Sequence, residues 1–166
     1  MIGVMFPDSI NNFARMVLDE ARAQGLHIAT AESCTGGHVV AALTEIPGSS
    51  DVVDRGFVVY TNAAKSAMLG VPATLIAQHG AVSEEVARAM AEGALKHAQV
   101  QLAVSCTGIA GPMGETPTKP IGLVHLAVAR SGHTTLHLEA RFGNVGRENV
   151  RMRSVEAALK LLLQTI

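Results

Sequence analysis

Three adjacent residues with nucleophilic side chains, Ser33, Cys34 and Thr35, lie between an apolar run and a helical run of the sequence. The apolar run, residues 27–30, has the composition of a strand, and residues 38–44 have that of a helix. Two glycines form the turn between them. Unpaired N–H groups at a helix N-terminus favour an anion or a developing oxyanion. The motif therefore predicts a nucleophilic site.

A serine at such a site needs a base to take its proton. The seven histidines are scattered along the sequence, and none lies in the segments that contain Ser33, Tyr60 or Thr107. Lys65 follows Tyr60 in an otherwise apolar segment, where loss of solvation would shift its ammonium group towards the neutral amine. Lys65 is therefore the predicted base for Ser33, and a solvated surface lysine is the alternative.

Two further residues have competing interpretations. Tyr60 is the only tyrosine and ends a predicted buried strand, so it either orients a proton near Ser33 and Lys65 or is a core phenol with its hydroxyl at the rim. Cys34 is the rival nucleophile because a helix N-terminus lowers a thiol pKa, although free cysteines are more often buried small residues. Glu32 would either orient a donor or cap the next helix.

The segment from Thr107 to Gly122, rich in glycine and proline, is too long to be only a connection. Its backbone N–H groups could hold an oxyanion or a phosphate, with Thr107 beside the nucleophile. The sequence contains neither a P-loop nor the glycine fingerprint of dinucleotide-binding folds. Arg147, Arg151 and Arg153 begin the last predicted helix, where an arginine suits a phosphate monoester. A solvated helix face is the alternative.

Helices and strands alternate along the sequence. The predicted helices are Asn11–Gln24, His38–Thr44, Thr61–Met68, residues 84–97 and residues 147–163. The predicted strands are residues 27–30, Phe57–Tyr60, Leu102–Ser105, Leu123–Ala129 and Thr134–Phe142, the last two as a hairpin. This order predicts the α/β class, with a mixed sheet covered by helices on both faces. Sites in such folds lie beyond the carboxyl ends of strands, where the segments after three of these strands converge.

Length and composition set limits on the class of protein. The 166 residues predict one domain, residues 1–166. A net charge of −1, four phenylalanines, one tyrosine and no tryptophan argue against nucleic-acid binding. Only 16% of the residues are charged, which favours a homodimer that covers apolar surface.

The sequence also indicates where the protein acts. No apolar run reaches the roughly 18 residues of a membrane span, and no Lys or Arg precedes Arg15 as in a signal peptide. Two cysteines, Cys34 and Cys106, do not make a disulfide framework. We therefore expect a cytoplasmic protein, and the scattered histidines predict no metal site.

These pieces together resemble the C-terminal domain family of CinA proteins, the nicotinamide-nucleotide amidases. The resemblance extends over about residues 10–165. Its motifs are Ala31-Glu32-Ser33-Cys34-Thr35-Gly36-Gly37, residues 57–65 with Leu69-Gly70-Val71, Gly80-Ala81-Val82-Ser83, Thr107-Gly108-Ile109-Ala110-Gly111-Pro112 and Lys119-Pro120-Ile121-Gly122.

The resemblance implies a three-layer α/β/α sandwich and hydrolysis of nicotinamide mononucleotide to nicotinic acid mononucleotide and ammonia, a step of pyridine nucleotide salvage. By this likeness Ser33 is the nucleophile, Lys65 its base and Tyr60 an assistant. The implied substrate-binding residues are Cys34, Thr35, Gly36, Gly37, Asn62, Thr107, Gly108 and Arg147. No metal or organic cofactor is implied, and the partner is a small-molecule nucleotide.

Two segments depart from the family pattern. Residues 112–115 read Pro-Met-Gly-Glu where the family has a run of glycines, and residues 142–147 are longer than the family's Gly-Asp-Arg turn. A nucleotide-binding module without turnover is the alternative function, and thiol chemistry at Cys34 is a third. The presence of Ser33, Tyr60 and Lys65 favours the enzyme.

Overall fold

The computed structural model describes residues 5–166. The α-helices are α1 (Asp8–Ala23), α2 (His38–Thr44), α3 (Asn62–Leu69), α4 (Ala73–His79), α5 (Glu84–Ala98) and α6 (Arg147–Thr165). The strands are β1 (Ile28–Glu32), β2 (Val53–Val58), β3 (Leu102–Gly108), β4 (Leu123–Arg130) and β5 (Leu136–Arg141), and a 3₁₀ turn, Ser49–Asp51, precedes β2. The alternation of helices and strands is as predicted.

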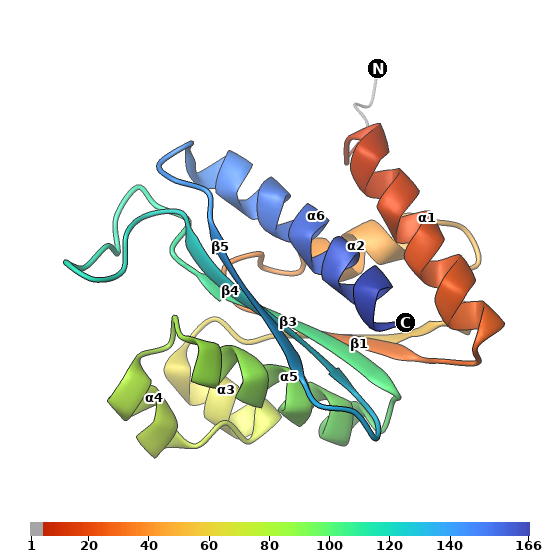
Figure 1. The fold of residues 1–166 in the computed structure, drawn as a ribbon, viewed down its shortest axis with the longest axis horizontal. Helices are drawn as coiled ribbons and strands as arrows, with labels where there is room; N and C mark the ends of the chain where they lie inside the picture. Colours follow the sequence, from red (N-terminus) through yellow and green to blue (C-terminus); the bar gives the residue numbers. More distant parts are fainter. Residues whose placement is uncertain (1–4) are drawn as a thin grey trace.

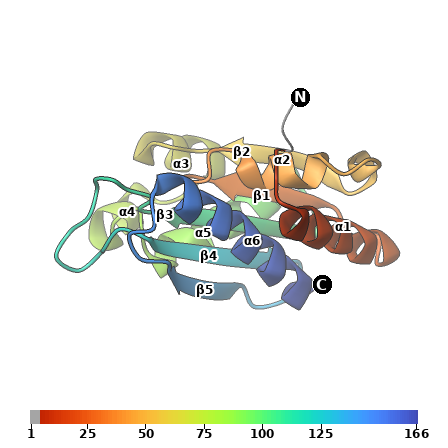
Figure 2. The same cartoon turned by 90° about the horizontal axis from the view of Figure 1, so that it is seen from above.

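The five strands form one mixed sheet in the order β2-β1-β3-β4-β5. Strand β1 is parallel to both β2 and β3, whereas β3, β4 and β5 pair antiparallel. Figure 1 shows α1, α2 and α6 on one face of the sheet and α3, α4 and α5 on the other. The view from above in Figure 2 shows α1, α2 and α6 lying over the sheet. The three-layer α/β/α architecture is confirmed.

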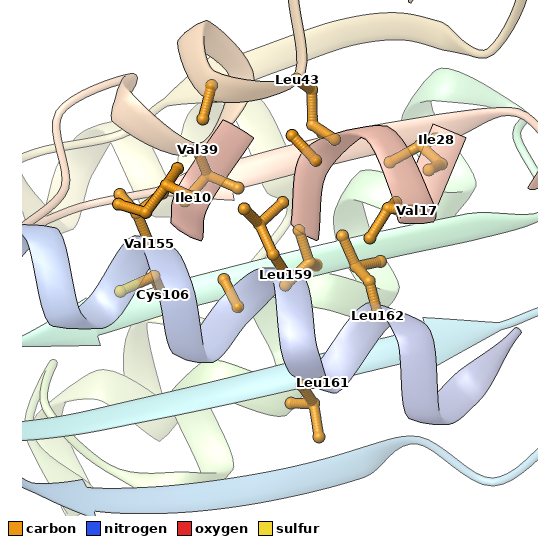
Figure 3. Packing of buried hydrophobic residues seen from close by; sticks show 14 of the residues in the cluster. Ile10, Val17, Ile28, Val39, Leu43, Cys106, Val155, Leu159, Leu161 and Leu162 are labelled. Carbon is orange, nitrogen blue, oxygen red and sulfur yellow. The ribbon is translucent and has the colours of Figure 1, made fainter. Parts of the chain in front are cut away.

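Each face of the sheet has its own core. On one face, α6 packs its buried leucines against α1, α2 and the central strands, as Figure 3 shows for Leu159 and Leu162 beside Val17 and Ile28. On the other face α5 packs on β3 and β4 through alanines, and Ala87 and Ala127 belong to one buried cluster there. Burial of these apolar surfaces, at about 25 cal/mol per Å², is the main force that holds the layers together.

The end of helix α3 packs closely against α5 at Gly93. Gly93 in α5 leaves room for the end of α3, because a Cβ at residue 93 would lie 2.1 Å from the carbonyl oxygen of Leu69. No real side chain tolerates that distance from a backbone atom. A glycine at this position therefore fixes how deeply α3 sits in the fold, and α3 carries Lys65.

Two sequence-based expectations need correction. Of the predicted buried strand Phe57–Tyr60, only Phe57 and Val58 lie in a strand, at the end of β2, an edge strand that begins at Val53 and is largely exposed. The apolar composition of this segment predicted burial. In the structure, however, Val58 is 47% exposed and Tyr60 lies beyond the end of the strand. Helix α4, which lies between Pro72 and Gly80, was not predicted. No helix within residues 5–166 is long and apolar enough to cross a membrane.

Candidate active site

Ser33 lies in the turn between β1 and α2, at the carboxyl edge of the parallel strands. Its N–H donates to the carbonyl of Cys106 on β3 (2.9 Å), and its own carbonyl accepts from the N–H of Gly36 (3.1 Å). Gly36 and Gly37 have φ values of +60° and +97°, which glycine adopts at little cost. The two glycines thus allow the sharp turn, and the sheet holds Ser33 in place.

The carboxylate of Glu32 caps helix α2. It accepts the N–H groups of Val39 (2.8 Å) and Val40 (3.0 Å) and the hydroxyl of Thr30 (3.0 Å), and the residue is buried. Of the two interpretations of Glu32, the cap is confirmed. The expectation that the N-terminus of this helix faces an oxyanion is wrong for these two N–H groups, because the carboxylate already occupies them.

Lys65 reaches Ser33 from the opposite layer of the sandwich. Its Nζ lies 3.0 Å from Ser33 Oγ, 3.1 Å from the carbonyl oxygen of Val59 and 3.3 Å from that of Tyr60. Thr61 caps the N-terminus of helix α3, and its hydroxyl accepts the N–H of Ala64, so Lys65 lies in the first turn and points inward. Lys65 is 1% exposed, and the surface alternative for this residue is therefore wrong.

Burial changes the acidity of this lysine. Loss of solvation lowers the pKa of the Lys65 ammonium group below its ordinary value, while the nearby Cys34 thiol group opposes the shift. No carboxylate hydrogen-bonds to Nζ within residues 5–166; its three partners are a hydroxyl and two carbonyl oxygens. An amine in this setting gives up its proton more readily than a surface lysine does.

The Ser33–Lys65 pair opens into a pocket of about 230 Å³. Besides these two residues, the pocket is lined by Cys34, Tyr60, Asn62, Ala81, Val82, Thr107, Gly108, Ile109, Ala110, Gly111, Met113, Gly114 and Arg147. The segments after β1, β2 and β3 therefore converge here, as predicted from the strand order. Of the predicted substrate-binding residues, Thr35, Gly36 and Gly37 do not line the pocket.

Tyr60 lines the pocket with Ser33 and Lys65, but its side chain is not buried. It is 62% exposed, and its hydroxyl lies 3.2 Å from Nη2 of Arg147. Nη1 of the same arginine donates to the carbonyl of Gly111 (2.9 Å). The phenol is thus not a core group, and its hydroxyl hydrogen-bonds to Arg147 rather than to Ser33. Instead, it is the backbone carbonyl of Tyr60 that contacts Lys65.

Residues 80–83 form a wall of the pocket that was not predicted from the sequence. The hydroxyl of Thr107 donates to the carbonyl of Ala81 (2.8 Å), and Ala81 and Val82 both line the pocket. Neither residue has a side chain with chemistry of its own. Only the resemblance of Gly80-Ala81-Val82-Ser83 to a family motif could have indicated this segment. The hydroxyl of Thr107 therefore fixes the position of this wall through its hydrogen bond to Ala81.

Cys34 and Cys106 are both buried free thiols, with their sulfur atoms 3.6 Å apart. The hydrogen bond between the two thiols lowers the pKa of Cys34 and, together with burial, raises that of Cys106. Cys34 also lines the pocket, but Nζ of Lys65 hydrogen-bonds to Ser33 Oγ. The contact with the base thus favours serine as the nucleophile.

The histidines are less scattered than expected, since the rings of His125 and His137 are 2.9 Å apart at their nearest nitrogens. The part of the chain from residue 5 onward nevertheless holds no group of three or more His, Cys, Asp or Glu side chains arranged for a metal. A larger groove of about 670 Å³ between α3 and α4 is lined mainly by alanines and contains no ionisable group. The chemistry therefore belongs to the smaller pocket.

The fold and the site define an α/β/α domain with a buried serine–lysine pair. Residues 10–166 match the model of the CinA C-terminal domain, and the chain belongs to this family. A CinA-like protein of Anaeromyxobacter sp. (strain K) is 48% identical over 158 residues, which cover 95% of this chain and 38% of the relative. The chain thus spans less than half the length of that relative.

Solved structures extend the likeness to the whole fold. The crystal structure of the competence/damage inducible protein CihA from Agrobacterium tumefaciens has a TM-score of 0.95 at 48% identity, with 98% of both chains covered. A CinA superfamily protein from Escherichia coli has a TM-score of 0.91 at 33% identity, covering 98% of this chain and 95% of the other.

Proposed function

We propose that this domain is a nicotinamide-nucleotide amidase of cytoplasmic pyridine nucleotide salvage, which hydrolyses nicotinamide mononucleotide to nicotinic acid mononucleotide and ammonia. The observation that carries the proposal is the 3.0 Å contact between Lys65 Nζ and Ser33 Oγ at the base of a pocket. A buried amine beside a hydroxyl is an arrangement that activates serine as a nucleophile. The resemblance to nicotinamide-nucleotide amidases supports the choice of substrate.

The contacts of Lys65 suit a general base. A neutral amine has two N–H groups and one lone pair, and the carbonyls of Val59 and Tyr60 provide acceptors for the two N–H groups. The lone pair then faces Ser33, whose hydroxyl donates to it. The backbone after β2 thus orients the lysine, which explains why the base belongs to a helix that directly follows that strand.

The reaction follows from these positions. Lys65 takes the proton as Ser33 Oγ attacks the carboxamide carbon, and the carbonyl oxygen becomes an oxyanion stabilised by backbone N–H groups. Collapse of this intermediate breaks the carbon–nitrogen bond, and Lys65 returns the proton so that ammonia leaves. Water then attacks the acyl-enzyme, with Lys65 again as base, and releases the carboxylate and Ser33. The electron-poor pyridinium ring makes this carbonyl easier to attack.

The pocket is matched to part of the nucleotide. Its 230 Å³ is smaller than the roughly 300–1,000 Å³ of pockets that enclose drug-sized ligands. It therefore suits the nicotinamide ring, with the ribose and phosphate at the rim. Arg147 is exposed at that rim, beside Tyr60 and Gly111, where its guanidinium can pair with a phosphate.

The test is ammonia release from nicotinamide mononucleotide by the purified protein without added metal. We expect turnover in the wild type and in the Ser131→Ala control, an exposed serine in the turn between β4 and β5. Ser33→Ala is expected to abolish it. Tight binding of the nucleotide without ammonia release from the wild type would contradict the proposal and favour a nucleotide-binding module.

A further inference from the structure

Arg151 on α6 forms hydrogen bonds to the turn that follows Ser33. Its Nε donates to the carbonyl oxygen of Cys34 and its Nη2 to that of Thr35, both at 3.2 Å. Nη2 also lies 2.9 Å from Nδ1 of His38. A Cβ at residue 36 would lie 3.2 Å from Nη2, so Gly36 leaves room for the guanidinium. One side chain from a distant helix thus holds two consecutive carbonyls of the active-site turn.

These bonds determine the direction of the N–H groups in the turn. In a planar trans peptide the C=O and N–H point in opposite directions. The Ser33 carbonyl is held by the N–H of Gly36, and the Cys34 carbonyl is held by Arg151. Both peptide units that flank the Cys34 Cα are therefore fixed by hydrogen bonds. A turn held at only one of these points could rotate.

Within residues 5–166, three N–H groups of this turn donate to no acceptor, those of Cys34, Thr35 and Gly37, and of these residues only Cys34 lines the pocket. In strand–turn–helix hydrolases, the N–H of the residue after the nucleophile stabilises the oxyanion. The neighbouring N–H of Gly36 is already used, and those of Val39 and Val40 are bonded to Glu32.

We propose that Arg151 is a positioning residue for the attack of Ser33. Arg151 holds the carbonyl of Thr35, which belongs to the same peptide unit as the Gly36 N–H, and that N–H holds the carbonyl of Ser33. Through this link it keeps the Cys34 N–H, which belongs to the peptide unit of the Ser33 carbonyl, directed at the oxygen that becomes negative when Ser33 Oγ bonds to the carboxamide carbon. The inference rests on the proposed function in that Ser33 is the nucleophile. It does not depend on which amide is the substrate.

The experiment compares Arg151→Met, Arg151→Lys and the control Arg153→Met. Arg153 is exposed on the same helix and does not line the pocket, so the expectation that it binds a phosphate there does not apply to it. An alkyl fluorophosphonate phosphonylates an activated serine, with loss of fluoride and of the serine proton, and the negative oxygen on phosphorus needs the same stabilisation as the oxyanion. The rate of Ser33 labelling is measured by intact-protein mass spectrometry. Values of kcat and KM for nicotinamide mononucleotide and the midpoint of thermal unfolding are measured beside it.

Loss of one oxyanion donor costs about 10²–10³-fold in kcat. We expect Arg151→Met to slow both labelling and kcat by about 10²-fold while KM changes little, since only the transition state is affected. Arg151→Lys is expected to recover part of the rate, because an ammonium can bond one of the two carbonyls. Arg153→Met is expected to match the wild type in every measurement.

Labelling of Ser33 in Arg151→Met at the same rate as in the wild type would overturn the inference. Equal losses of labelling rate and kcat in Arg151→Met and Arg151→Lys, with a raised KM and a lower unfolding midpoint, would also overturn it. Such a result would indicate that Arg151 supports the fold in general. Labelling that depends on Arg151 in a protein that releases no ammonia would refute the proposed substrate and support the role of Arg151. A wild type that neither reacts with the probe nor turns over would overturn both.

Discussion

The side-chain nitrogen of Lys65 lies 3.0 Å from the hydroxyl of Ser33, although the two residues approach the sheet from opposite layers. Ser33 precedes α2 on one face, and Lys65 belongs to α3 on the other. They meet because β1 and β2 are parallel neighbours whose carboxyl ends share one edge. This contact between Lys65 and Ser33 has consequences for activity and stability that can be measured.

Replacing Lys65 by methionine is expected to lower amidase turnover by about 10²–10⁴-fold, the usual contribution of a general base. Methionine has nearly the same length and is apolar, so the fold should persist. Circular dichroism and ammonia release measured together check this expectation. Turnover near the wild-type level in a folded variant would rule out Lys65 as the base.

Activity should increase with pH as the Lys65 ammonium group loses its proton. Burial lowers its pKa, so the increase is expected below the roughly 10.4 of a free lysine. The measurement is kcat/KM for nicotinamide mononucleotide across pH, which reports the free enzyme. A profile that stays flat up to the pKa of free lysine would contradict the assignment.

Stability should depend on pH for the same reason. Between the lowered folded pKa of Lys65 and the unfolded value near 10.4, the unfolded chain binds more protons than the folded one. The free energy of unfolding therefore rises with pH across that window. Lys65→Met is expected to remove this rise in urea titrations, whereas Lys96→Met, at an exposed position late in α5, should keep it.

Glu32→Gln tests the cap on α2. The amide would present an N–H₂ group where the carboxylate now accepts from Val39 and Val40, leaving at least one buried donor unpaired. Such a loss costs about 1–3 kcal/mol of unfolding free energy. Urea denaturation provides the measurement. An unchanged midpoint would show that the cap contributes little to stability.

Cys34→Ala separates serine from thiol chemistry. The thiol contacts Cys106 rather than the base, so we expect the alanine variant to retain ammonia release, with a small loss of stability from the cavity left behind. If the reaction stops in this variant while Ser33→Ala remains active, the thiol is the nucleophile.

Much of this site could be predicted from the sequence because its signals are local. The small nucleophilic residues and the glycines at 33–37 define the turn, and the strand order brings the three loops together. The role of Arg151 could not be predicted, since its contacts with Cys34 and Thr35 depend on how α6 packs across the sheet. The exposure of Tyr60 was missed for a similar reason, because an apolar edge strand and a buried one look alike in sequence.

The cap formed by Glu32 also provides a local probe of the nucleophile turn. The capped N–H groups of Val39 and Val40 lie just beyond Ser33 in the chain and are sheltered only while β1 and α2 stay together. Any opening of the turn must release them to solvent. Their rates of amide hydrogen exchange therefore report, in the resting protein and without substrate, how often the nucleophile leaves its working position.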